Sequence, residues 1–133
     1  MSCDYGVWFS SKRLSSDEAG RLYEALSEGS PDMVEAHPSV TAFYDELVML
    51  HPEIDTIPED RIDDHDYCPW SCAIDRSPGH VIVACVWPKA DYVGALISSL
   101  ARRHGLIMYD PQSHRVFYPD EAPHPSKPWW KLW

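Results

Sequence analysis

The sequence predicts an α+β fold in which an antiparallel sheet carries helices on one of its faces. Segments with alternating or continuous apolar residues, typical of strands, are interspersed with segments whose apolar residues recur every three or four positions, typical of helices. Turns rich in proline and glycine separate these segments. A chain of 133 residues is long enough for one domain with a single core.

The first predicted elements are a strand over residues 3–9 and the helix that follows it. Alternate residues from Cys3 to Phe9 are apolar, which is the pattern of a strand with one buried side. Ser15 and Glu18 have the spacing of a capping box, in which each side chain bonds the backbone N–H of the other residue. The stretch Gly29-Ser30-Pro31 ends this helix.

A second helix is predicted from Pro38 to the residues before Pro52. Proline suits the first turn of a helix, where its missing N–H has no partner, and it stops a helix elsewhere. The apolar stripe of this helix is Val40, Phe43, Tyr44, Leu47 and Leu50. Residues 53–69 form an acidic, irregular connection, and the sequence leaves open whether it is loop or partly helical.

A hairpin is predicted next. Residues 70–75 and 80–87 have strand patterns, and the continuous apolar run of the second is typical of a central strand. Ser77-Pro78-Gly79 between them favours a turn, because proline presets φ and glycine tolerates positive φ.

The last part of the chain predicts a helix, two strands and a tail. The helix begins at Pro88 and stops at Gly105, residues 106–109 form a strand, and residues 115–118 add an edge strand after a turn that starts at Asp110. One domain therefore spans residues 1–118. Residues 119–133 are a tail rich in proline and tryptophan, which docks on the domain's own sheet or meets a partner.

These elements give the order βαββαβ with an extra N-terminal helix, a variant of the ferredoxin-like plan. Right-handed crossovers place the helices on one face of the antiparallel sheet. The opposite face is then open and is suited to binding a ligand or a second copy of the chain.

Negative charge is concentrated in the middle of the chain. Ten acidic residues and one basic residue, Arg61, lie between Asp45 and Asp75, so this segment carries −9 of the formal −10. Such a surface attracts basic protein surfaces and repels the phosphates of nucleic acid. We therefore expect a basic protein partner and no nucleic acid.

No targeting or membrane-spanning segment is expected, because no apolar run approaches the roughly 18 residues of a membrane span. The four cysteines, Cys3, Cys68, Cys72 and Cys85, lie mostly in or beside apolar runs, and Cys72 is expected to point into the sheet core. Such cysteines are typical of small buried side chains in a reducing compartment. We expect a cytoplasmic protein that is a monomer or a homodimer and does not bind membranes.

No cofactor, metal or catalytic activity is expected. His65, Cys68 and Cys72 are the densest group of metal-capable side chains, but their spacing matches no recognised zinc pattern. The sequence has no Gly-x-Ser-x-Gly elbow, no His-Glu-x-x-His pair and no glycine-rich phosphate loop. His104, at a helix end, is expected to complement the helix dipole rather than to act as a base.

Three short stretches carry a resemblance to known proteins. Residues 85–90 (Cys-Val-Trp-Pro-Lys-Ala), residues 104–113 (His-Gly-Leu-Ile-Met-Tyr-Asp-Pro-Gln-Ser) and the opening Tyr5-Gly-Val-Trp8 resemble small bacterial proteins of immunity-protein type. The resemblance covers both ends of the domain and leaves the acidic middle unmatched. It implies a protein that neutralises a toxin, and it names no catalytic or binding residue.

The sequence therefore favours a non-enzymatic binding protein, most concretely an immunity protein that docks an acidic surface on a basic toxin. The residues expected to steer or anchor the partner are Asp55, Glu59, Asp60, Asp63, Asp64, Asp66, Tyr67 and Trp70. One alternative is a ferredoxin-like regulatory or small-ligand domain that acts as a homodimer through its open sheet face. Another is an enzyme with acids around a deep pocket on that face.

Overall fold

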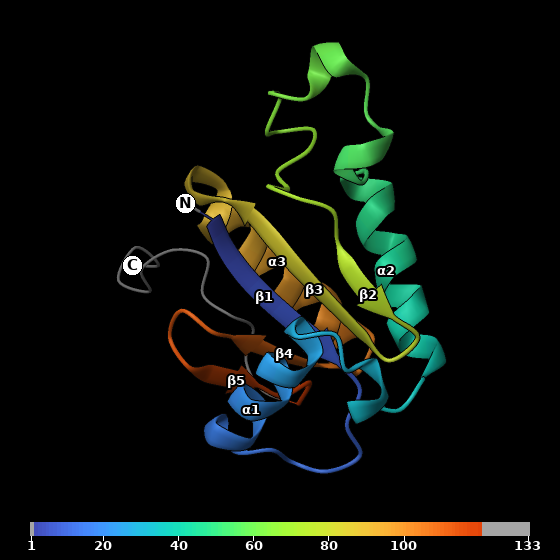
Figure 1. The fold of residues 1–133 in the computed structure, drawn as a ribbon, viewed down its shortest axis with the longest axis vertical. Helices are drawn as coiled ribbons and strands as arrows, with labels where there is room; N and C mark the ends of the chain where they lie inside the picture. The colour runs from blue at the N-terminus through green and yellow to red at the C-terminus, as the bar shows by residue number, and fades with distance from the viewer. Residues whose placement is uncertain (1, 121–133) are drawn as a thin grey trace.

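The computed structural model describes residues 2–120, which fold as an α+β protein (Figure 1). Its strands are β1 (Ser2–Trp8), β2 (Asp75–Ser77), β3 (His80–Val86), β4 (Ile107–Asp110) and β5 (Arg115–Phe117). Its helices are α1 (Ser16–Ser27), α2 (Pro38–Leu50) and α3 (Ala90–Arg103), and short 3₁₀ turns occupy Pro31–Met33, Ile54–Thr56, Glu59–Arg61 and Trp87–Lys89. The α+β class that the sequence predicts is confirmed.

The five strands form one antiparallel sheet in the order β2-β3-β1-β4-β5. β1 is central: it pairs with β3 along its whole length, from Ser2 opposite Val86 to Trp8 opposite His80. Its last three residues, from Gly6 to Trp8, also pair with β4. The edge strands β2 and β5 have three residues each, so they offer little unpaired backbone to another chain.

Helices cover both faces of this sheet. Val7, Val81 and Met108 point toward α2 and α3, and the residues next to them in sequence, such as Trp8, Ile82 and Ile107, point toward α1. A Cβ added to Gly6 would lie 2.9 Å from the Tyr23 ring, which shows that α1 packs directly on β1. The expectation of helices on one face is therefore wrong, because the extra helix α1 occupies part of the face that was expected to be open.

The local signals at the helix ends act as the sequence predicts. The Ser15 hydroxyl accepts the Glu18 backbone N–H at 3.1 Å, and the Glu18 carboxylate accepts the Ser15 N–H at 2.9 Å. Gly105 has a φ of +70°, which a residue with a side chain rarely adopts, and β4 begins two residues later. These signals succeed because they depend on neighbours in sequence alone.

The segment expected to be a strand over residues 70–75 has a different structure. Trp70 forms a single bridge to Cys85, and regular pairing starts only at Asp75, where β2 leads into the turn before β3. Residues 71–73 are exposed because the chain leaves the sheet there, so Cys72 points into solvent rather than into the core. The hairpin itself is confirmed, with a shorter first strand.

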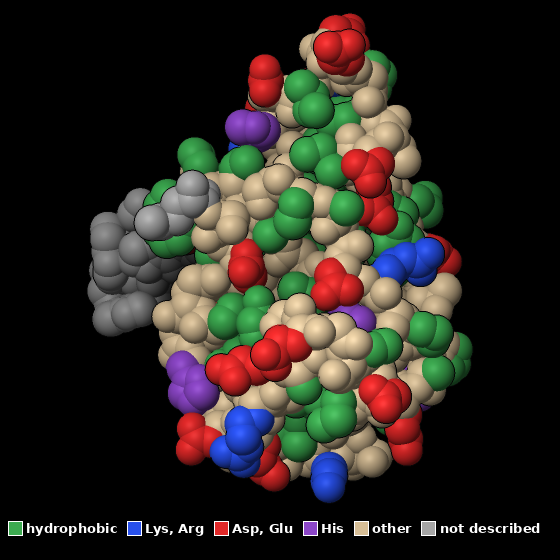
Figure 2. All heavy atoms as spheres, viewed as in Figure 1, with side chains coloured by type: hydrophobic (Ala, Val, Ile, Leu, Met, Phe, Trp, Pro, Cys, Tyr) green, Lys and Arg blue, Asp and Glu red, His purple; other side chains and the backbone are tan. Residues whose placement is uncertain are grey.

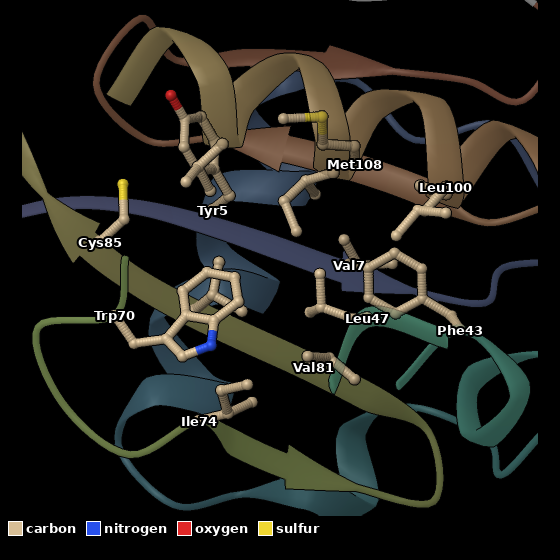
Figure 3. Packing of buried hydrophobic residues seen from close by; sticks show 14 of the residues in the cluster. Tyr5, Val7, Phe43, Leu47, Trp70, Ile74, Val81, Cys85, Leu100 and Met108 are labelled. Carbon is tan, nitrogen blue, oxygen red and sulfur yellow. The ribbon is translucent and has the colours of Figure 1, made fainter. Parts of the chain in front are cut away.

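The main core lies between the sheet and the helices α2 and α3 (Figure 3). Within the described range, 2–120, no helix has the length and apolar character that a membrane crossing needs. The tail tryptophans, Trp129, Trp130 and Trp133, lie outside the described residues, so their expected docking stays a prediction.

Candidate partner-binding surface

Residues 53–66, called the acidic lobe below, project beyond the end of α2 (Figure 1). The lobe contains the two 3₁₀ turns Ile54–Thr56 and Glu59–Arg61 and is otherwise irregular. The side chains of Ile54 and Ile57 pack against the main core. The lobe is therefore a folded extension of the domain, and its acidic residues from Asp55 onward are exposed.

The buried imidazole of His51 joins the base of the lobe to the domain. Its Nδ1 lies 3.0 Å from the Tyr67 carbonyl oxygen, and its Nε2 lies 2.7 Å from the Tyr92 hydroxyl. Because a carbonyl can only accept, Nδ1 carries the proton and Nε2 of the neutral ring accepts from Tyr92. The Trp70 indole N–H donates to the His51 carbonyl at 3.1 Å, so both ends of the lobe meet at this point.

Glu53, the first acid of the lobe, is used inside the protein. Its carboxylate accepts the Tyr44 hydroxyl from α2 and the Ile74 backbone N–H, the latter at 2.9 Å. Burial raises the pKa of Tyr44, and the bond to Glu53 raises it further. Glu53 therefore closes the lobe onto α2 and the chain before β2, and it is not available to a partner.

Two of the expected steering residues carry ion pairs. Asp64 lies 3.0 Å from Arg61, whose hydrogen bond lowers the pKa of that carboxyl, and Asp66 pairs with Lys89 next to α3. The Arg61 guanidinium also lies 3.7 Å from the centre of the half-buried Tyr67 ring. The charge of Asp64 and Asp66 is thus partly neutralised before any partner arrives.

Four other residues that are expected to steer a partner are exposed and unpaired among residues 2–120. Asp55, Glu59, Asp60 and Asp63 are exposed, and none of them forms a side-chain hydrogen bond or an ion pair with the described part of the chain. They lie within nine positions of one another on the lobe. Like charges gathered in this way raise the negative potential over one region of the surface.

Exposed apolar side chains lie on the same part of the molecule. Met49 is 84% exposed, and Leu50 and Ile62 are about half exposed. In Figure 2 hydrophobic side chains, in green, lie between the acidic ones, in red, over the upper part of the molecule. The sequence does not indicate this feature, because Leu50 has the spacing of the apolar stripe of α2 and yet is exposed.

Trp70 is not a surface anchor. Its side chain is 2% exposed and packs among Cys85, Ile74 and Val81 in the main core (Figure 3). The expectation that it contacts a partner is therefore wrong, because its indole ring and its N–H are both used within the fold.

The acidic segment 45–75 does not form one patch. Glu46 of α2 bonds Arg103 and His104 at the end of α3, and Asp75 on β2 lies 3.4 Å from His80. Glu46 and Asp75, which lie outside the lobe, therefore interact with other parts of the fold. The concentration of charge in sequence becomes a smaller group of unpaired carboxylates in space.

The other sequence candidates do not converge. Among residues 2–120 no three side chains of the metal-binding types lie close enough to hold an ion, and Cys68 is buried whereas Cys72 is exposed. Asp110 accepts the Gln112 N–H and the Ser113 hydroxyl, both at 3.0 Å, which is the behaviour of a turn residue.

Comparison with known proteins assigns no family. No family model matches the chain, and neither the curated proteins nor the solved structures that were compared with it gave a match. The function therefore has to be argued from the residues and their geometry.

Proposed function

We propose that this protein is a non-enzymatic binding protein that holds a basic protein surface against its acidic lobe. The observation that carries the proposal is the group of four exposed carboxylates, those of Asp55, Glu59, Asp60 and Asp63, which are unpaired within the described residues. An unpaired carboxylate keeps its charge available for association, whereas a carboxylate that is already paired gains less from a partner.

The exposed apolar side chains at the end of α2 and on the lobe support a protein partner rather than a free cation. Protein interfaces combine apolar contact area with a polar rim, and Met49, Leu50 and Ile62 would supply such area beside the carboxylates. A small cation would need converging oxygen ligands instead.

The most concrete form of the proposal is an immunity protein that neutralises a cognate toxin. Toxins that attack nucleic acid tend to be basic around their active sites, so an acidic lobe would match the charge of their substrate and speed association. The resemblance of residues 85–90 and 104–113 to proteins of immunity type favours the same function.

We also infer a ferredoxin-like arrangement as the finer description of the fold. The strand order β2-β3-β1-β4, with α2 and α3 on one face, supports it, and α1 and β5 are additions. The alternative function, a homodimer formed through an open sheet face, has less area to use because α1 lies on part of that face.

Growth of cells that express the product of the adjacent gene tests the immunity function. We expect that product to stop growth when it is expressed alone, and we expect co-expression of this protein to restore growth. Toxicity that this protein does not relieve, or an adjacent product that is harmless, would count against an immunity function.

Association kinetics with the same partner test the lobe directly. Asp55→Lys, Asp60→Lys and Asp63→Lys in one variant should slow association about tenfold or more at low salt and flatten its salt dependence. The matched control reverses three exposed acids elsewhere, Glu28, Asp32 and Glu35, which gives the same change in net charge. Equal slowing in both variants would mean that net charge, and not the lobe, steers association.

A further inference from the structure

The helix α1 lies at the opposite end of the molecule from the acidic lobe (Figure 1). A cavity is lined by α1 and by residues at and after the end of β4. Its volume is about 400 Å³, and it opens between α1 and the turn that joins β4 to β5. The α1 wall carries Asp17, Arg21 and Glu24, and the opposite wall carries Tyr109 and His114. None of these residues belongs to the acidic lobe.

A chain of hydrogen bonds through His114 joins the two walls. Its Nε2 lies 3.0 Å from Asp17 Oδ1, and its Nδ1 lies 2.7 Å from the Tyr109 hydroxyl oxygen. A carboxylate only accepts, so in the neutral ring Nε2 carries the proton and Nδ1 accepts from the Tyr109 hydroxyl. The Tyr109 hydroxyl then donates its proton in a hydrogen bond to His114 Nδ1. Its oxygen keeps a lone pair that can accept a hydrogen bond from a ligand in the cavity.

Two features that are unfavourable for folding lie at this hydrogen-bonded group: a positive φ at a non-glycine residue and a glycine inside a helix. His114 is the one non-glycine residue with a positive φ, 55°, within residues 2–120. Gly20 interrupts the interior of α1, and a Cβ there would lie 3.0 Å from both the Tyr109 hydroxyl oxygen and His114 Cε1. Local rules that are broken together in one place commonly mark a functional site.

Acceptors dominate the polar groups around the cavity. The Tyr109 side chain, only 3% exposed, places its oxygen at the inner end, and Asp17 and Glu24 add carboxylates at the rim. The Tyr23 ring, 5.5 Å from the Tyr109 ring, supplies an apolar wall. Arg21 is the one lysine or arginine of the described lining, and it is exposed.

Three carboxylates lie close enough to the Tyr109 hydroxyl to affect its pKa. Burial is the main cause of the raised pKa of Tyr109, and the carboxylates of Asp110, Glu24 and Asp17 raise it further. A charge that stabilises the neutral phenol in this way also attracts a positive ligand.

We propose that this cavity binds an alkylammonium group, which donates hydrogen bonds to the Tyr109 oxygen and to the carboxylates of Glu24 and Asp17. An ammonium group offers three donors and a positive charge, which complements a set of acceptors with net negative charge. The attached methylene groups would lie along the Tyr23 ring. The site shares no residue with the lobe, so it does not depend on the proposed toxin partner.

Titration of the full chain with n-butylamine, followed by amide NMR, tests the proposal. We expect saturable shifts at Gly20, Tyr109 and His114, and no such shifts with n-butanol, which has the same chain without the charge. Glu24→Gln should weaken binding about tenfold, because it removes one charge-assisted hydrogen bond. Glu28→Gln, at the residue just past the C-terminal end of α1 and outside the cavity lining, is the matched control and should bind as the wild type does.

Two more variants move binding in opposite directions. Arg21→Ala removes the neighbouring positive charge and should tighten binding, whereas Gly20→Ala places a methyl group against Tyr109 and His114 and should weaken it. Thermal melts of each variant show whether the fold is intact. The absence of saturable shifts, equal shifts with n-butanol, or equal losses in Glu24→Gln and Glu28→Gln would overturn the proposal.

Nα-acetyl-lysine methylamide distinguishes two sources of an alkylammonium group, the lysine side chain of another protein and a free amine. A cavity that receives a lysine side chain of another protein should bind this probe at least as tightly as n-butylamine. A cavity for a free amine should prefer n-butylamine. Binding of neither probe would overturn the proposal.

Discussion

The hydroxyl of Tyr92, on the first turn of α3, lies 2.7 Å from Nε2 of the buried His51, just beyond the end of α2. The other nitrogen of the same ring bonds the carbonyl of Tyr67, the residue that directly follows the acidic lobe in sequence. One imidazole thus connects two helices and the segment that extends beyond them. The position of the lobe depends on this connection more than on contacts made by its own exposed acids.

Tyr92→Phe is therefore expected to lower the free energy of unfolding by about 1–3 kcal/mol, because it leaves His51 Nε2 buried without a donor. Urea denaturation measures the change. Met49→Ala, at a side chain that makes little contact, is the control and should stay within about 0.5 kcal/mol of the wild type. Equal stability of Tyr92→Phe and the wild type would contradict the role given to His51.

Glu53 and Asp55 allow a matched comparison of two acids at the start of the lobe. Glu53→Ala should destabilise the protein by about 1.5–3 kcal/mol, since the Tyr44 hydroxyl and the Ile74 N–H lose a charged acceptor. Asp55→Ala should change stability by no more than about 0.5 kcal/mol. Urea denaturation measures the free energy of unfolding of both variants. Similar losses in the two would show that the contacts of Glu53 with Tyr44 and Ile74 do not hold the lobe in place.

The free energy of unfolding should decrease as the pH is lowered through a range that His80 sets. Burial lowers the pKa of His80 below its ordinary value of 6.5, although Asp75 opposes the shift. The unfolded chain therefore binds this proton more tightly, so the stabilising contribution is complete above about pH 6.5 and is lost as the pH falls through the folded-state pKa. Thermal melts between about pH 7.5 and 5 should show this loss, and His80→Gln should show less of it.

A separate loss should follow at lower pH. Hydrogen bonds with His104 and Arg61 lower the pKa values of Glu46 and Asp64, so these carboxyls contribute stability above about pH 4.5 and lose it in more acidic solution. A wild-type profile that stays flat down to about pH 4.5 would contradict the assignment of the first loss to His80.

Thiol labelling should distinguish one cysteine from the other three. Cys72 is exposed, whereas Cys3, Cys68 and Cys85 are buried, and burial raises the pKa of Cys85 to about 12. A thiol reagent should label one site in the native protein and four after denaturation, as counted by mass spectrometry. Cys72→Ser should remove the native label; rapid labelling of a second site would contradict the burial of the remaining thiols.

Local signals made most of the fold predictable from the sequence. The capping box of Ser15 and Glu18 and the positive φ of Gly105 need only neighbouring residues, and both mark real helix ends. The position of α1, on the face of the sheet opposite to α2 and α3, was not predictable from local signals. Val7 and Trp8 on β1 point to opposite faces and are both buried, so alternation along the strand did not reveal that the second face is also covered.

The candidate surface was predictable in position but not in composition. Glu53, Asp55 and Asp64 have the same chemistry in the sequence, yet one closes the lobe, one is open and one is paired with Arg61. The three acids differ in which groups from distant parts of the sequence lie beside them, such as the Ile74 N–H beside Glu53. A local sequence pattern does not indicate such contacts. Trp70 was misplaced for the same reason, since its environment depends on β3.

The isolation of α1 on its own side of the sheet has a consequence for motion. α2 and α3 share one large core, whereas α1 is attached through a smaller separate cluster around Trp8, Leu26 and Ile107. Amide protons of α1 should therefore exchange with solvent through a partial opening that leaves α2 and α3 in place. Whatever occupies the space beneath α1 would slow that exchange and leave the exchange of α3 unchanged.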